Sequence, residues 1–145
     1  MTRFACVVLV DPRGWVLLQE RDEHARIAPE RWSYSGGHVE PGESDLDAAV
    51  RELAEETGIE VAAADLRLHG HFDLFHPETR SQDTIAFFTA PTELTDDDVV
   101  LGEGRQIVFV DPEVARGLPL SDLAATTLPA FLDSDLYAEL SRRPA

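Results

Sequence analysis

The hydrophobic and polar positions at the start of the chain follow the pattern of two strands joined by a turn. Residues 4–10 are apolar and rich in β-branched side chains, and residues 15–19 repeat that strand pattern. Residues 11–14, between them, are Asp-Pro-Arg-Gly, which is a composition typical of turns. We therefore predict an N-terminal β-hairpin.

Further strands are predicted where short apolar runs stand between polar, turn-forming residues. They are residues 32–34, 66–75, 84–90 and 106–110. The polar segment 21–31 is expected to be a loop, and the strand at 32–34 is expected to end at Gly36 and Gly37. Because alternate residues of a strand point to opposite faces, we expect His69 and His71 to share one face of the sheet.

Residues 44–57 change to a helical period. One apolar stripe runs along this segment through Leu46, Ala49, Val50, Leu53 and Thr57. Ser44, with Asp47 three residues later, resembles a capping box, and Gly58 stands where a left-handed cap is expected. The pattern thus predicts a helix with both ends marked.

The C-terminal part, from Ser121, is also expected to be helical, in one or two pieces. Pro129 fits the first turn of a helix better than its middle. Together the elements predict an α+β fold, an α/β/α sandwich with a mixed β-sheet between helices. At 145 residues the chain is expected to form a single domain, residues 1–145.

Composition and charge exclude several classes of partner. The 28 acidic and 12 basic residues give a formal net charge of −16, which argues against nucleic acid and anionic membranes as partners. The apolar runs are too short to span a bilayer, and no signal peptide is recognised. With Cys6 as its one cysteine, the chain is expected to be cytoplasmic.

The polar face of the predicted helix carries three glutamates. Glu52, Glu55 and Glu56 are spaced i, i+3 and i+4, so they share one side of the helix and repel one another. A solvated acidic surface is one interpretation of such a triplet. The other is a site for a hard divalent cation such as Mg²⁺, with Arg51 orienting a carboxylate.

The residues around the triplet favour the second interpretation. In order they are Gly37, five residues, Glu43, seven residues, and then Arg51-Glu52-Leu53-Ala54-Glu55-Glu56-Thr57-Gly58-Ile59. This spacing resembles the Nudix box, the loop–helix–loop signature of the Nudix hydrolase superfamily, at every fixed position. The order of strands and helices over most of the chain is also similar to the Nudix fold.

The resemblance implies an enzyme, a Nudix-type pyrophosphohydrolase that uses Mg²⁺ or Mn²⁺ to hydrolyse a phosphoanhydride bond by attack of water on phosphorus. It further implies that Glu52, Glu55 and Glu56 are metal ligands, with the backbone carbonyl of Gly37. We interpret Glu43 as structural, because negative charge near a helix start is favourable.

A further carboxylate from a later loop is implied as a metal ligand or general base. Glu103, between Gly102 and Gly104, is our candidate, and its alternative is a plain turn residue. The acidic run 96–98 is a rival for the same role, although three acids in a loop are more often solvated charge.

Candidates for substrate binding are Arg21, Tyr34 and His38. Arg21 has the charge to bind phosphate, Tyr34 has a ring that can stack on a base, and His38 follows the two glycines. The alternative roles are surface solubility for Arg21, core packing for Tyr34, and surface or core packing for His38. We favour a core position for Trp32.

Two departures from the resemblance bear on the substrate. Ser35 stands where relatives often have proline before the two glycines, and the residues that mark ADP-ribose or dinucleoside polyphosphate branches are not clearly present. By elimination, the expected substrate is a nucleoside triphosphate, oxidised ones included, or a broad range of nucleotides. ADP-ribose, nucleotide sugars and dinucleoside polyphosphates remain alternatives, as does a non-catalytic nucleotide-binding module. An isoprenoid diphosphate isomerase is disfavoured by the position of Cys6, and a homodimer is left open.

Overall fold

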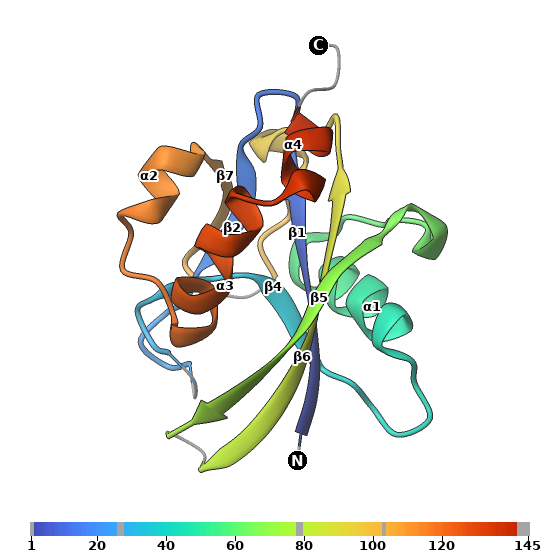
Figure 1. The fold of residues 1–145 in the computed structure, drawn as a ribbon, viewed down its shortest axis with the longest axis vertical. Coiled ribbons are helices and arrows are strands. Elements are labelled where there is room, and N and C mark those ends of the chain that lie inside the picture. Colours follow the sequence, from blue (N-terminus) through green and yellow to red (C-terminus); the bar gives the residue numbers. More distant parts are fainter. Residues whose placement is uncertain (1, 26–27, 78–79, 103, 142–145) are drawn as a thin grey trace.

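The computed structural model describes residues 2–25, 28–77, 80–102 and 104–141. At its centre lies a mixed β-sheet (Figure 1). Its strands are β1 (Thr2–Val10), β2 (Val16–Glu20), β3 (Trp32–Ser33), β4 (Ser35–His38), β5 (Arg67–His76), β6 (Ser81–Pro91) and β7 (Gln106–Val110). β1 and β6 pair in parallel along their length, and the other pairs are antiparallel.

Helices cover both faces of this sheet, which confirms the predicted α/β/α sandwich (Figure 1). The helices are α1 (Asp45–Thr57), α2 (Pro112–Arg116), α3 (Asp122–Leu132) and α4 (Asp135–Ser141), with 3₁₀ turns at Ala63–Asp65 and Asp96–Asp98. One apolar core lies between the sheet and α1, and the other between the sheet and α2–α4. Alternate residues of β1 supply the two cores, as the two-residue period of a strand requires.

Helix α1 begins and ends as the sequence predicts. The Ser44 hydroxyl accepts a hydrogen bond from the Asp47 N–H, which satisfies one of the unpaired donors of the first turn. Gly58 has a φ of 74° and ends the helix in the left-handed conformation, where its N–H bonds the Ala54 carbonyl. Ala49 and Leu53, from the predicted stripe, are fully buried.

The N-terminal hairpin is confirmed, but the segment after it differs from the prediction. β1 and β2 meet at Val10 and Val16 and then diverge, because β4 takes the place of β2 beside the first half of β1. Gly36 and Gly37 lie inside β4 and do not follow a strand. A Cβ atom at Gly36 would collide with the carbonyl oxygen of Ala5, so close approach to β1, and not turn geometry, requires this glycine.

The expectation that His69 and His71 share a face is wrong. A β-bulge between Leu68 and Gly70 shifts the register with β6, which reverses the side of the sheet that His69 faces. His69 packs against Phe87 and Phe131, at 5.0 and 5.2 Å between ring centroids, whereas the imidazole of His71 lies 3.6 Å from the Asp45 carboxylate at the start of α1.

The C-terminal region is helical in two pieces, α3 and α4, but the break falls at a different place from the one Pro129 suggested. Pro129 lies in the second half of α3, and the helix ends at Asp133. The buried side chains of Leu128, Phe131 and Leu132 keep this half of α3 docked on the sheet, so packing offsets the hydrogen bond that the proline lacks. Over the described ranges, no helix has the length and apolar character needed to cross a membrane.

The position of His69 predicts a pH-dependent stability. Burial among aromatic rings lowers the pKa of His69 below its ordinary value of 6.5. As the pH falls through about 6.5, the unfolded chain takes up this proton before the folded chain does, so the stability that neutral His69 contributes is lost below that pH.

We therefore expect the free energy of unfolding in urea to fall more in the wild type than in His69→Phe between about pH 7.5 and about pH 5. The phenylalanine keeps a ring in the cluster but does not titrate. Equal pH dependence in the two proteins would contradict this role for His69.

Candidate functional site

The close approach of helix α1 to strand β4 places two carboxylates of the helix against the glycine pair. The backbone N–H of Gly36 donates a hydrogen bond of 2.9 Å to Oε2 of Glu56. A Cβ atom added to Gly37 would lie 2.5 Å from Cδ of Glu52, so no larger residue fits there while Glu52 keeps its position. Glu56 is almost completely buried, which is unusual for a carboxylate and is consistent with its backbone partner.

Arg51 holds the acidic groups around it in fixed positions. Its Nε and Nη2 donate to the two oxygens of Glu43 at 2.8 and 2.9 Å, and its Nη1 donates to Glu52 at 2.8 Å and to Glu55 at 3.4 Å. Its Nη2 also donates to the carbonyl oxygen of His38 in β4. One guanidinium therefore ties three carboxylates to the backbone of β4.

These contacts fix the charge state of Glu43. The hydrogen bonds from Arg51, followed by the one from the Glu40 N–H, lower the pKa of Glu43 to about 2. The same carboxylate, with Glu52, raises the pKa of Arg51 above its ordinary value. Glu43 thus stays ionised at any physiological pH and serves as an anchor for Arg51, which agrees with the structural role expected from the sequence.

The donor set around Arg51 fits a hard cation in its chemistry. Glu52, Glu55 and Glu56 supply carboxylate oxygens from one helix face, and these are the ligands that Mg²⁺ prefers. Among the residues that the structure describes, however, no three Asp, Glu, His or Cys side chains converge on one point. Two of the three carboxylates instead contact the guanidinium of Arg51, which supplies the positive charge beside them.

A cavity of about 420 Å³ opens beside this cluster. Its wall includes five residues that the sequence singled out as candidates: Arg21, Tyr34, Gly37, His38 and Glu52. A carboxylate of α1, the strand backbone beside it and the candidate substrate-binding residues therefore meet in one space. The volume falls in the range of sites that take a nucleotide-sized ligand.

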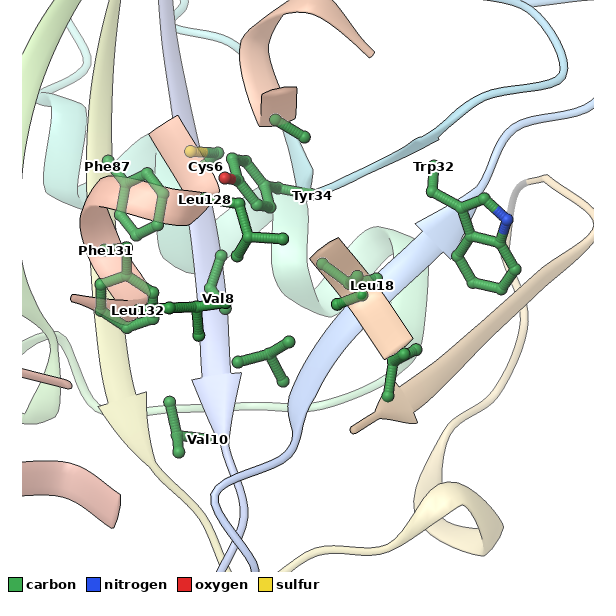
Figure 2. Close-up of a cluster of buried hydrophobic side chains, with 14 of the residues drawn as sticks. Cys6, Val8, Val10, Leu18, Trp32, Tyr34, Phe87, Leu128, Phe131 and Leu132 are labelled. Carbon is green, nitrogen blue, oxygen red and sulfur yellow. The ribbon is translucent and has the colours of Figure 1, made fainter. Parts of the chain in front are cut away.

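Both aromatic residues before the glycines, Trp32 and Tyr34, are buried. Tyr34 is 3% exposed, and its hydroxyl lies 2.7 Å from Oγ1 of Thr127 in α3. Figure 2 shows its ring among Cys6, Phe87 and Leu128, with Trp32 at the far end of the same cluster. Desolvation raises the pKa of Tyr34, so its phenol stays neutral. Tyr34 can offer the cavity only part of its ring, and Trp32 has the core position we favoured.

Arg21 and His38 stand at the edges of the cavity. Arg21 follows directly after β2, and its backbone N–H donates to the Arg31 carbonyl. The ring of His38 packs on that of Phe4, with 4.4 Å between centroids. Both residues line the cavity, and their roles in binding stay predictions.

The later acidic candidates have different outcomes. Glu103 lies outside the described residues; its neighbour Gly102 donates a 2.8 Å hydrogen bond to the carbonyl of Glu56. In the rival run, Asp96 accepts from the N–H of Phe109, and Asp98 caps the turn at Thr95. Those two carboxylates satisfy backbone donors, which favours a structural role for this run.

Sequence reasoning missed four polar residues of the cavity wall: His24, Ser33, Ser121 and Asp122. The hydroxyl of Ser121 donates to that of Ser33 at 2.8 Å, and the Ser121 N–H bonds the Trp32 carbonyl. This contact joins residues 88 positions apart. No local pattern could have indicated it, because it depends on where α3 docks.

Comparisons with known proteins agree with this arrangement. Residues 1–134 match the NUDIX domain family. The chain is 33% identical to a Nudix hydrolase of Pseudomonas aeruginosa over 135 residues, which cover 88% of this chain and 76% of the relative. It is also 30% identical to the CTP pyrophosphohydrolase of Escherichia coli, over 86% of this chain and 87% of the relative.

A solved structure described as the MutT protein of Methanosarcina mazei Go1 shares the fold. It superimposes with a TM-score of 0.76 over 98% of this chain and 96% of that one, at 23% sequence identity. With the box glutamates beside the glycine strand and a family match over nearly the whole sequence, the chain belongs to the NUDIX domain family.

Proposed function

We propose that this Nudix-type nucleotide pyrophosphohydrolase cleaves a nucleoside triphosphate, with a divalent cation held by Glu52, Glu55 and Glu56. The observation that carries the proposal is that Glu52 and Gly37 form part of the wall of the 420 Å³ cavity. A nucleotide in that cavity has its phosphates within reach of the helix carboxylates. The family typically uses a divalent metal, which supports the choice of cofactor.

A cation is required for electrostatic reasons as well. The chain carries a formal charge of −16, and Glu52 and Asp122 line the cavity, so an anionic diphosphate would be repelled. A bound Mg²⁺ or Mn²⁺ would neutralise that charge and make a water molecule acidic enough to attack phosphorus.

Other residues of the site orient the carboxylates and bind the substrate. Arg51 orients Glu52 and Glu55, and Glu43 in turn orients Arg51. The hydrogen bond from Gly36 directs Glu56 toward β4. Arg21, which lines the same cavity, can bind phosphate oxygens, and Glu103 remains our candidate for a further ligand or general base.

Nucleoside triphosphates are the substrate class that we favour. The relative from Escherichia coli acts on CTP, which favours nucleoside triphosphates over nucleotide sugars, ADP-ribose or dinucleoside polyphosphates. A non-catalytic nucleotide-binding module is the alternative from another functional class. It is disfavoured because all three box glutamates and their arginine are present.

The test of the proposed function is a hydrolysis panel with identification of products. With Mg²⁺, we expect at least one nucleoside triphosphate, from a set that includes oxidised purines, to be cleaved to a monophosphate and pyrophosphate. Activity is expected to disappear with EDTA and to return with Mg²⁺ or Mn²⁺. Tight nucleotide binding without turnover at any metal concentration would favour the module.

Glu56→Gln tests the buried carboxylate. Glutamine still offers an oxygen to the Gly36 N–H, so the fold is expected to persist while the ligand charge is lost. We expect kcat to fall by about a hundredfold or more, with circular dichroism unchanged. Glu60→Gln, an exposed position just beyond the helix, is the matched control and should keep its activity. Full activity in Glu56→Gln would remove this residue from the mechanism.

Gly37→Ala tests the close approach of β4 to α1. The new Cβ would meet the end of the flexible Glu52 side chain, so stability should change by less than about 1 kcal/mol while Glu52 is displaced. We expect the Mg²⁺ concentration needed for half-maximal activity to rise by about tenfold or more. Gly70→Ala, where the added atom makes only an ordinary 3.4 Å contact with Phe72, is the control. An unchanged Mg²⁺ requirement in Gly37→Ala would contradict the proposed ligand role of Glu52.

A further inference from the structure

Part of the cavity wall also borders a second cavity. This wall segment, residues 21–25, contributes Arg21, His24 and Ala25 to the 420 Å³ cavity. The same three residues line a second cavity of about 190 Å³, together with Gln19 and Gly104. With two cavities beside it, the wall segment has less packing around it than a core segment does.

The backbone hydrogen bonds of this region are mostly local. Arg21 bonds Arg31, and the N–H groups of His24 and Glu30 both bond Asp22. Glu30 also has a φ of 61°, in the left-handed region that side chains other than glycine adopt at a cost. A contact from outside the loop can therefore influence where the wall segment lies relative to the rest of the fold.

Arg105 supplies that contact. Its Nη2 lies 2.9 Å from Oε2 of Glu23 in the wall segment and 3.0 Å from Oε1 of Glu30 just beyond it. Its Nη1 lies 3.8 Å from Glu20, the residue before the segment. The guanidinium of Arg105 thus contacts Glu20, Glu23 and Glu30. Arg105 lies 82 positions after Glu23 and 75 positions after Glu30 in the sequence.

The backbone of Arg105 is held in place by its contacts with Glu20. Its backbone N–H donates to the Glu20 carbonyl at 2.9 Å. Gly104 passes so close to the same carbonyl that an added Cβ would lie 2.7 Å from it, and its φ of 84° also favours glycine. The backbone of Arg105 is therefore held against the last residue of β2, and its side chain extends from this fixed position.

The segment that leads to Arg105 is also attached to α1. Val100 donates to the Thr57 carbonyl and Gly102 to the Glu56 carbonyl, each at 2.8 Å. A Cβ on Gly102 would lie 2.5 Å from the Glu55 carbonyl, so this attachment is close. Val100 and Gly102 are thus attached to the end of the carboxylate helix, and Arg105 is attached to the end of β2, where the wall segment begins.

We propose that Arg105 is a positioning residue that sets the location of the wall segment, and with it the distance between Arg21 and the carboxylates of α1. This inference rests on the proposed function, because it assigns to the wall segment a part in substrate binding. Arg105 itself lines neither cavity and acts through Glu23 and Glu30.

The effect is expected to be moderate and sensitive to salt. Each ion pair is partly exposed to solvent, and exposed pairs contribute little individually. Two carboxylates of the same loop, however, are held by one guanidinium, so the two ion pairs act together. The same two carboxylates, Glu30 and Glu23, raise the pKa of Arg105, so the arginine is charged throughout the physiological range.

The first experiment measures hydrogen–deuterium exchange of the full chain without nucleotide. In Arg105→Ala, we expect amides of residues 21–25 to exchange about fivefold faster than in the wild type. The matched control is Arg116→Ala, which removes an exposed ion pair with Asp133, 2.9 Å long, away from both cavities. Concentrated NaCl should accelerate exchange of the wall segment in the wild type and change it less in Arg105→Ala.

The second experiment measures kinetics on the nucleoside triphosphate that the wild type hydrolyses fastest. We expect Arg105→Ala to raise KM by about fivefold and to change kcat by less than about twofold, because the carboxylates of α1 are untouched. The charge-exchanged double variant Arg105→Glu with Glu23→Arg should exchange amides of residues 21–25 more slowly than Arg105→Ala does. Its KM should lie between the values of Arg105→Ala and the wild type.

Unchanged exchange of residues 21–25 in Arg105→Ala would overturn the proposal, as would faster exchange with an unaltered KM. If no nucleotide is hydrolysed by the wild type, the proposed function fails. Faster exchange in Arg105→Ala would then still support the structural part of the inference, and unchanged exchange would refute it.

Discussion

The site depends on one constraint, the close approach of helix α1 to strand β4. Gly36 donates its N–H to the buried Glu56, and Gly37 leaves room for Glu52 beside the strand. A side chain at either glycine would separate the two elements or displace a carboxylate. Arg51 then compensates the negative charge that this approach concentrates. The Nudix signature can thus be understood as the set of residues needed to hold acidic side chains against a strand backbone.

The parts of the fold that the sequence predicts correctly are those encoded locally. Helix α1 carries its own stripe, its Ser44 cap and its Gly58 end, so no distant contact was needed to recognise it. Most of the strands follow from alternation and turn residues in the same way. The glutamate triplet was also visible as a pattern that folding does not require, although its relation to the cavity came only from the docking of α1 on β4.

Most of the incorrect predictions concern residues whose position depends on a contact with a distant part of the sequence. The bulge before Gly70 redirects His69 toward Phe131, which belongs to a helix more than fifty residues later. Pro129 sits in the second half of α3 because its neighbours Leu128 and Phe131 are buried. The short helix α2 was missed although Asp111 and Pro112 are typical cap and first-turn residues, so here a local signal existed and was not used.

The parallel pairing of β1 with β6 has a consequence for how the chain folds. Residues 2–10 pair with residues 83–91, so the centre of the sheet closes across about eighty positions of sequence. During synthesis the apolar strand β1 therefore emerges long before its main partner, and β2 and β4 cover only part of its other edge. Until β6 leaves the ribosome, the free edge with Val7, Val8 and Leu9 exposes backbone donors and apolar surface to other chains. The nascent protein is consequently most vulnerable to aggregation in the interval between the emergence of β1 and that of β6.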